Sequence, residues 1–477
     1  LIADAIETAT NGQMMDGVLV VGGCDKNMPG GMMAIARMNV PAIYVYGGTI
    51  KPGKWKGQDL TIVSAFEAVG AFTAGKMSKE DYDGIERNAC PTVGACGGMY
   101  TANTMSSAFE ALGLSLPYAS TMANVEDEIV GMVQRAADVL VAAVKADLKP
   151  RDICTEASFH NAVKTVLAIG GSTNACVHLP AMAGRLGIKL PLSVWEQYNR
   201  EIPVLANLMP AGTALMEDFF FAGGLPALLK QIAPHLDASC RNITGGTLGD
   251  VISNAEIFNA DIIRPLDNAV SKEAIAVVTG NLAPRGAVMK PSAASPHLLK
   301  HSGPAVVFEN FADMQARIDS PDLDVSKDSV LVLKNVGPVG APGMPEAGNL
   351  PIPKKLLEQG VRDMVRLSDA RMSGTHYGTC VLHVCPESAV GGPLALVRNG
   401  DLIALDVAAR SITLQVPVQE LDRRHAEWQL AQQAAPAARR YRRSYAALYQ
   451  QHVTQADEGA DFDFLQGAEL LPEPTIF

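Results

Sequence analysis

Two short apolar runs, separated by a glycine-rich loop and a stretch of helical composition, most constrain what this chain can fold into. Residues 17–22 (GVLVVG) and 42–46 (AIYVY) are each typical of a strand buried on both faces, and residues 30–38 have helical composition. A strand, a helix and a second strand in this order favour two parallel strands with a helical crossover. Such units build sheets with helices on both faces, so we expect a parallel-sheet αβα fold for the N-terminal part.

The pattern of predicted secondary structure changes near residue 261. Helical patterns dominate residues 61–148 and 158–186, whereas short β-type runs separated by Gly, Pro and Asn turns follow residue 261. These runs are residues 275–278, 305–308, 330–333, 402–407 and 412–416. Regular short strands with turn signals predict a β-barrel-like domain. We therefore expect an α/β chain with two domains, 1–260 and 261–477.

Both ends of the chain have helical patterns. Residues 1–10 place apolar side chains on one face of a helix, and residues 421–452 return to a helical pattern with Pro436 as a break. We expect helices to flank the C-terminal barrel. Because neither an initiator Met nor a signal-peptide pattern precedes the first helix, we also expect the sequence to begin inside a domain, with an upstream segment missing.

The charge pattern argues against polyanionic partners. The formal net charge is −11 and charged residues make up 19% of the chain, so we expect neither nucleic acid nor an anionic membrane as a partner. A short basic cluster near the C-terminus is interpreted as a solvated helix face or a subunit contact; it comprises Arg439, Arg440, Arg442 and Arg443. The chain lacks an apolar stretch of about 18 residues, so no transmembrane helix is expected.

The eight cysteines are unevenly spaced and do not resemble a disulfide framework. Without a secretion signal, a reducing cytoplasm is the expected location. Five of the cysteines are predicted to pack as small buried residues: Cys154, Cys176, Cys240, Cys380 and Cys385. The other three lie in or near glycine-rich loops, where metal binding or catalysis is the alternative to packing.

The first such loop, residues 22–30 (GGCDKNMPG), follows the first predicted strand. Ligands bind at the carboxyl ends of strands in open α/β sheets. Cys24 offers a soft thiolate and Asp25 a hard carboxylate, so the pair suits a soft and a hard metal side by side. A glycine-rich turn with a buried Cys and a solvated Asp–Lys pair is the alternative on local features alone.

The second loop, residues 90–104, carries Cys96 ahead of a helix predicted to begin between Thr101 and Thr104. A helix N-terminus lowers the pKa of a thiol and favours an anionic ligand or a cluster. Cys90 and Cys96 do not have a zinc-finger spacing.

Two further motifs lie in the C-terminal part. Residues 337–346 (GPVGAPGMPE) hold Glu346 after a stiff Gly/Pro-rich loop, where a carboxylate is either a metal ligand or an ordinary exposed residue. Residues 368–378 (SDARMSGTHYG) place Ser373 before a Gly–Thr pair, which could present a hydroxyl and backbone N–H groups to an anion. This is not the Gly-x-Ser-x-Gly motif of a hydrolase, and residues 170–174 match neither a Walker A nor a Rossmann fingerprint.

Together and in this order, the four motifs resemble the dihydroxy-acid and sugar-acid dehydratase family, which includes dihydroxy-acid dehydratase, the aldonate dehydratases and 6-phosphogluconate dehydratase. The resemblance runs through nearly the whole chain, with further matching pieces at residues 168–174, 280–284 and 290–293. It implies a hydro-lyase that converts a 2,3-dihydroxy carboxylic acid into a 2-keto acid. It also implies a homodimer or a dimer of dimers, with the site between the two domains.

The resemblance further implies the cofactors and their ligands. Cys24 and Cys96 are similar to two thiolate ligands of an iron–sulfur cluster, with 2Fe–2S favoured over 4Fe–4S. Asp25 and Glu346 are similar to ligands of an adjacent Mg²⁺. Lys26 is similar to the lysine that the family carbamylates, and a carbamate would supply the anionic oxygen that Mg²⁺ prefers.

By the same resemblance, Ser373 matches the general base of the family, with Thr375 close by. A serine hydroxyl is a weak base, so this role requires strong local positive charge. The family's third cluster cysteine and a further Mg²⁺ carboxylate would fall before residue 1. Cys90 is a possible third thiol because it lies near Cys96 in the chain, but it does not occupy the position of the family's third cluster cysteine.

Different segments of the chain resemble enzymes that act on two different classes of substrate. Residues 23–30 and 94–117 look closest to the branched-chain biosynthetic enzyme, whereas residues 207–220 and 458–464 look more like aldonate dehydratases. We expect a 2,3-dihydroxy-3-methylbutanoate-type acid, with arabinonate, xylonate or gluconate as the alternative.

Two other functions remain to be weighed against dehydration. One is an inactive iron–sulfur scaffold or sensor, and the other is a hydrolase that uses Ser373. The joint presence of Ser373 and all three predicted Mg²⁺ ligands argues against both.

Overall fold

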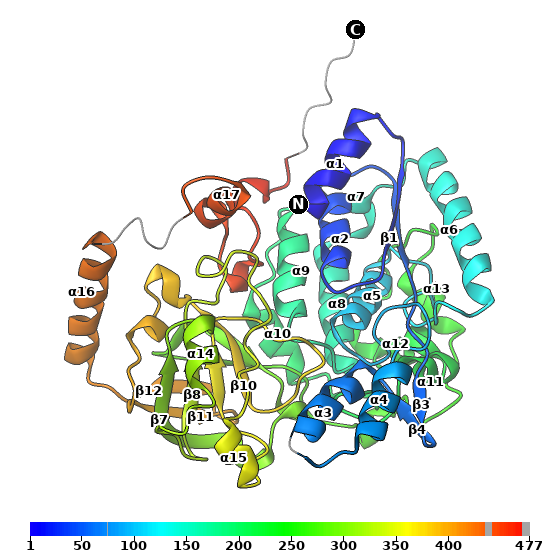
Figure 1. The fold of residues 1–477 in the computed structure, drawn as a ribbon. Helices are drawn as coiled ribbons and strands as arrows, with labels where there is room; N and C mark the ends of the chain where they lie inside the picture. The colour runs from blue at the N-terminus through cyan, green and yellow to red at the C-terminus, as the bar shows by residue number, and fades with distance from the viewer. Residues whose placement is uncertain (74, 435–440, 470–477) are drawn as a thin grey trace.

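The computed structural model describes residues 1–73, 75–434 and 441–469. Helices dominate its first half, and a β-barrel with flanking helices follows (Figure 1). The two parts lie side by side, and the mixed α/β character expected from the sequence is confirmed.

The predicted β–α–β unit is present near the start of the chain. β1 (Val18–Gly22) and β2 (Ala42–Tyr46) pair in parallel, and α2 (Asn27–Met38) connects them. The helix begins three residues before the expected start at residue 30. Because the strands are parallel, the loops that follow Gly22 and Tyr46 leave from the same edge.

The parallel sheet of the N-terminal part is narrower than expected. Among the described residues it holds only β1 and β2, while β3 (Gly53–Trp55) and β4 (Gln58–Leu60) form a separate antiparallel hairpin. All twelve residues of α5 (Thr101–Leu112) are buried. A buried helix therefore takes the central place that we expected a broad sheet with helices on both faces to occupy.

Helices form most of the remaining N-terminal part. In chain order they are α1 (Ile2–Gly12), α3 (Ile62–Thr73), α4 (Lys79–Asn88), α6 (Glu128–Lys145), α7 (Pro150–Ile153), α8 (Glu156–Ala168), α9 (Ala175–Gly184), α10 (Leu192–Asn199), α11 (Met216–Phe221), α12 (Gly224–Gln231) and α13 (Leu248–Ser253).

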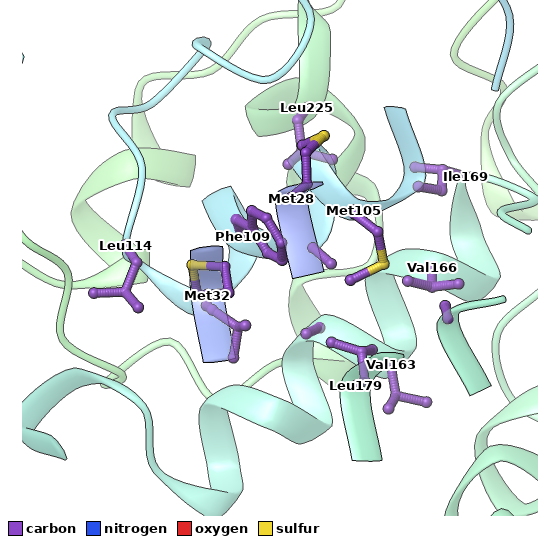
Figure 2. Packing of buried hydrophobic residues seen from close by; sticks show 14 of the residues in the cluster. Met28, Met32, Met105, Phe109, Leu114, Val163, Val166, Ile169, Leu179 and Leu225 are labelled. Carbon is purple, nitrogen blue, oxygen red and sulfur yellow. The ribbon is translucent and has the colours of Figure 1, made fainter. Parts of the chain in front are cut away.

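The core of this part forms where α2, α5, α8 and α9 meet (Figure 2). Its side chains are almost fully removed from water, and burial of such surface is the main favourable contribution to folding. Members of the cluster include Met28, Met32, Met105, Phe109, Val163, Val166 and Leu179. This packing fixes the N-termini of α2 and α5, the two helices that follow the cysteine loops.

The predicted β-barrel is confirmed. Eight strands close it in the order β10-β6-β5-β12-β11-β7-β8-β9. They are β5 (Ala276–Gly280), β6 (Ala283–Met289), β7 (Lys300–Phe308), β8 (Val330–Leu333), β9 (Arg366–Ser368), β10 (Cys380–Cys385), β11 (Leu402–Asp406) and β12 (Ser411–Leu414). Since β7, β8, β9 and β10 run parallel, the loops that follow β8 and β9 leave from one edge of the barrel.

In the part of the chain from residue 261 onward that the structure describes, four α-helices occur: α14 (Phe311–Arg317), α15 (Lys354–Glu358), α16 (Val418–Ala434) and α17 (Tyr445–His452). Pro436, Arg439 and Arg440 lie outside the described residues. Arg442 and Arg443 precede α17, so they do not form the helix face that was one interpretation of the basic cluster. Within the described ranges, no helix is long and apolar enough to span a membrane.

Candidate active site

The first cysteine loop follows β1 and leads directly into α2. Asn27 accepts a hydrogen bond from the backbone N–H of Cys24 at 3.1 Å, and Cys24 Sγ lies 3.5 Å from Asp25 Oδ1. Burial raises the pKa of the Cys24 thiol, and the adjacent Asp25 carboxylate raises it further. A metal ion would reverse this balance, because a bound cation stabilises the thiolate.

The second cysteine loop lies against the chain that leaves β2. Ile50 N donates to Ala95 O at 2.7 Å, and Ala95 N donates to Gly48 O at 2.8 Å. Gly94 makes this approach with a φ of +130°, and a Cβ there would lie 2.5 Å from the carbonyl of Thr49. Since β1 and β2 are neighbours, these contacts bring the Cys96 loop to the edge from which the Cys24 loop leaves.

The charge of the Cys24 thiolate contributes to the pKa of the Cys96 thiol. Burial raises the pKa of Cys96 to about 11, and the charges of Cys24 and Asp25 add to this shift. The structure therefore brings the loops of Cys24 and Cys96, the two cysteines that the sequence singled out, to the same edge of the β1–β2 pair. Cys90 is exposed, and the five cysteines predicted to be buried are buried.

A buried asparagine holds the Cys96 loop. Asn103 lies in the first turn of α5 and is fully buried. Its Nδ2 donates to the carbonyls of Cys96 and Gly98 at 2.5 and 2.7 Å, and its Oδ1 accepts from Tyr46 Oη at 2.6 Å. Its amide thus connects β2, α5 and the thiol loop. This role of Asn103 was not predicted from the sequence, although the residue lies within the second motif.

The predicted Mg²⁺ ligands converge on the Lys26 ammonium group. Lys26 Nζ lies 2.8 Å from Asp25 Oδ2 and 2.9 Å from Glu346 Oε2. Burial acts to lower the pKa of Lys26, but hydrogen bonds to the two carboxylates outweigh it and raise the pKa. This contact joins the loop after β1 to the loop after β8, and so connects the N-terminal part to the barrel.

Asn174 supports Glu346 from the helical side. Its Nδ2 donates to Glu346 Oε1 at 2.6 Å and to Thr101 Oγ1 at 3.0 Å. Its loop is itself held by the barrel, because the buried Lys290 donates to Gly170 O at 2.6 Å. The sequence did contain a signal for Asn174, because this polar residue ends the glycine-rich segment 170–174. The sequence could not predict that its partner is Glu346.

The Ser373 loop follows β9 and lies against the N-terminus of α5. A Cβ on Gly374 would lie 2.9 Å from Thr101 N, so glycine permits this close approach. Ser373 Oγ lies 3.0 Å from Thr375 Oγ1, so the two hydroxyls are close to each other, as expected. The N-terminus of a twelve-residue helix carries positive potential, which favours an anionic oxygen nearby.

The donor set fits the expected cofactors in kind. Two carboxylates flank a lysine that would become an anionic oxygen ligand on carbamylation, and such oxygens suit a hard divalent cation. Two thiols suit two positions of an iron–sulfur cluster. Asn174 Oδ1, which is buried, has no hydrogen-bond partner among the described residues. Across those residues, no group of three or more His, Cys, Asp or Glu side chains could hold a metal ion, so the expected Mg²⁺ set of Asp25 and Glu346 depends on a third oxygen donor from the Lys26 carbamate.

A cavity of about 480 Å³ opens beside this set of residues. Lys26, His178, Met344 and Arg371 form part of its wall. Of the predicted ligands and the predicted base, only Lys26 lines this cavity, so the cavity meets the candidate site at that residue.

Comparisons with known proteins agree along the whole chain. Residues 1–251 match the family described as Dihydroxy-acid/6-phosphogluconate dehydratase N-terminal, and residues 261–460 match its C-terminal counterpart. A 6-deoxy-6-sulfo-D-gluconate dehydratase of Pseudomonas putida is 46% identical over 488 residues, with 100% of this chain and 82% of the relative covered. Dihydroxy-acid dehydratases of Ralstonia nicotianae and Leptothrix cholodnii are 48% and 49% identical, over 97% and 98% of this chain and 82% of each relative.

These matches define an enzyme of the hydro-lyase class. The chain belongs to the dihydroxy-acid/6-phosphogluconate dehydratase family.

Proposed function

We propose that this protein removes water from a 2,3-dihydroxy carboxylic acid and releases a 2-keto acid, with an iron–sulfur cluster and Mg²⁺ as cofactors. One observation carries the proposal: Lys26 Nζ lies between Asp25 and Glu346 and lines a cavity, and Asp25 in turn lies 3.5 Å from the Cys24 thiol. A hydrolase that uses Ser373 would not need this group of metal-type donors.

Cys24 and Cys96 would hold the cluster, and Asp25, Glu346 and carbamylated Lys26 would hold Mg²⁺. When bound, these cofactors supply Lewis acidity for the departing C3 hydroxide and positive charge beside the substrate carboxylate. Carbamylation replaces the Lys26 cation by an anion between two carboxylates, so a divalent cation is needed to offset the repulsion.

Ser373 would take the proton from C2 of the substrate. The C2–H bond breaks, the C3–O bond breaks, and the hydroxide leaves as water once it gains a proton, giving an enol that tautomerises to the 2-keto acid. A serine hydroxyl needs help to act as a base, and the N-terminus of α5 beside Gly374 provides positive potential. Thr375, at 3.0 Å from Ser373 Oγ, would orient the hydroxyl.

For the substrate, we propose 2,3-dihydroxy-3-methylbutanoate or a similar branched acid. The 48% and 49% identity to dihydroxy-acid dehydratases over nearly the whole chain supports this choice. A sugar acid is the second candidate, because the Pseudomonas putida relative, 46% identical, is named for 6-deoxy-6-sulfo-D-gluconate. Both classes have hydroxyls at C2 and C3 of a carboxylic acid.

We further propose a 2Fe–2S rather than a 4Fe–4S cluster, a cytoplasmic location, and a homodimer or dimer of dimers, with neither nucleic acid nor membrane as a partner. The αβα description of the N-terminal part is proposed only for the β1–α2–β2 unit and the helices that pack around it.

The test is 2-keto acid formation under anaerobic conditions, comparing 2,3-dihydroxy-3-methylbutanoate with arabinonate, xylonate, gluconate and 6-deoxy-6-sulfogluconate. Faster turnover of the branched acid supports the first choice of substrate, and faster turnover of a sugar acid supports the second. Absence of keto acid from every substrate, in protein that shows cluster absorbance and binds Mg²⁺, would contradict dehydration and leave the inactive scaffold as the better account.

A further inference from the structure

Glu346 lies in a long connection between β8 and β9 that contains only one short helix, α15. A metal ligand on an irregular loop needs external support, because a displacement of about 1 Å is enough to impair a metal or catalytic site. The contacts of the Glu346 loop therefore show what fixes the carboxylate.

Arg371 contacts this loop on both sides of Glu346. Its Nε donates to Met344 O at 2.8 Å, and its own carbonyl accepts from Gly348 N at 2.7 Å. Its Nη1 lies 3.8 Å from Glu346 Oε1, and only 7% of its side chain is exposed. One residue thus holds the backbone two positions before and two positions after the carboxylate.

Asp369, two residues earlier on the same segment, holds the start of the loop. Its Oδ1 accepts from Val336 N at 3.0 Å and its Oδ2 accepts from Ser388 N at 2.9 Å, and the residue is fully buried. Burial raises the pKa of Asp369, although these hydrogen bonds act to lower it. Asp369 and Arg371 together tie the Glu346 loop to the segment that continues to Ser373.

The two oxygens of Glu346 have different surroundings. Oε1 accepts from Asn174 Nδ2 and faces Arg371, whereas Oε2 faces Lys26 Nζ in the direction of Asp25. Oε1 therefore accepts a hydrogen bond from Asn174 and lies 3.8 Å from the charge of Arg371, whereas Oε2 is the oxygen directed at the other proposed ligands. Residues that orient metal ligands in this way commonly change metal affinity when they are replaced.

We propose that Arg371 is a positioning residue that fixes Glu346 with Oε2 directed at the metal and keeps Glu346 in register with Ser373. This inference rests on the proposed Mg²⁺ site and assigns a function to a residue outside the ligand set and the general base. Arg371 acts through Glu346 and does not need to contact the substrate.

The test measures metal binding rather than turnover. Mn²⁺ replaces Mg²⁺ as the probe, and the free ion is quantified by electron paramagnetic resonance in anaerobically prepared holoenzyme. Arg371→Met is expected to weaken Mn²⁺ binding about 10- to 100-fold, while the cluster absorbance remains. Arg371→Lys keeps the charge but loses the fork that reaches both Met344 O and Glu346, so its affinity should fall between those of Arg371→Met and the wild type.

Arg424→Met is the matched control, because Arg424 is another buried arginine, paired with Asp401 beside the barrel. It should lower stability without changing Mn²⁺ affinity. Wild-type affinity in folded Arg371→Met would overturn the positioning role. If Arg371→Met does not fold, Arg371→Lys decides: affinity equal to wild type overturns the role, and weaker affinity with an unchanged melting temperature supports it.

The same measurement distinguishes a failure of the proposed Mg²⁺ site from a failure of the inference about Arg371. If the wild-type holoenzyme itself does not bind Mn²⁺, the Mg²⁺ site is wrong and the inference about Arg371 is overturned with it. If the wild type binds Mn²⁺ but the Arg371 variants bind it equally well, only the inference about Arg371 is lost.

Discussion

Lys26 Nζ lies 2.9 Å from Glu346 Oε2, although the two residues are 320 positions apart in the chain. Lys26 is placed by the parallel pair β1–β2 and Glu346 by the parallel run of strands in the barrel. The candidate site is therefore assembled only when the barrel docks onto the helical part. Lys290, which reaches Gly170 across the same boundary, reinforces that docking.

The bridging position of Lys26 leads to a prediction about its modification. We expect the carbamate on Lys26 to form with Mg²⁺ and to be lost when the metal is removed with a chelator, because three anionic groups repel one another without a cation. Intact-mass measurement and carbon NMR after exchange with labelled CO₂ would follow it. An equal carbamate signal with and without Mg²⁺ would show that the two are not coupled.

Lys26→Arg separates the two proposed forms of Lys26, which are the cation that bridges Asp25 and Glu346 and the carbamate that binds Mg²⁺. Arginine can still bridge Asp25 and Glu346 but cannot form the carbamate, so folding should be preserved to within about 1 kcal/mol, as expected for a pair with an exposed partner. Dehydration should fall by about 100-fold or more, the scale associated with loss of one preorganised electrostatic contact. Turnover and thermal unfolding of the same preparation give both values.

Ser373→Ala tests the proposed base. Its turnover should drop by about 100- to 10,000-fold, the usual contribution of a general base, while the cluster absorbance and Mn²⁺ affinity stay at wild-type values. Thr375→Ser, which keeps the hydroxyl beside Ser373 Oγ, is the control and should retain most activity. Loss of the cluster in Ser373→Ala would mean that Ser373 has a structural role instead.

The sequence predicted the elements better than their arrangement. The barrel strands could be predicted because each short β-type run ends in a turn signal; β8, for example, has the same bounds as its run. α5 was harder to place, since its Thr, Asn and Ser residues are typical of a partly exposed helix. It is buried because those polar groups have partners in other elements, as Asn103 does with Tyr46 and the Cys96 loop.

Cys24, Asp25 and Lys26 are consecutive, so the chain itself places them together, but the family resemblance was needed to assign Lys26, Cys96 and Glu346 as ligands. Supporting residues such as Asn174 and Arg371 have partners far away in the chain. Periodicity and turn chemistry describe neighbours along the chain, whereas these contacts arise from packing between the two parts of the molecule.

The buried amide of Asn103 should control cluster assembly. Asn103→Ala removes the donor to two carbonyls of the Cys96 loop and leaves them and Tyr46 Oη without this partner, which costs about 1–3 kcal/mol per unpaired buried group. We expect reduced cluster content and a lower melting temperature. Asn281→Ala, which removes an amide paired with the backbone of Leu414 in the barrel, is the control and should lower stability while preserving the cluster.

Glu110 should make stability depend on pH. It is buried in α5, and burial raises its pKa to about 7 despite hydrogen bonds from Tyr118 N and Ser120 N. The folded state therefore keeps its proton up to about pH 7, whereas the unfolded chain loses it near pH 4.5. The stabilising contribution is complete below pH 4.5 and is lost as the pH rises to about 7, by an amount on the order of 3 kcal/mol. Glu110→Gln should remove this slope, so the difference in unfolding free energy between variant and wild type should shift in favour of the variant across this pH range; a constant difference would show that Glu110 does not titrate there.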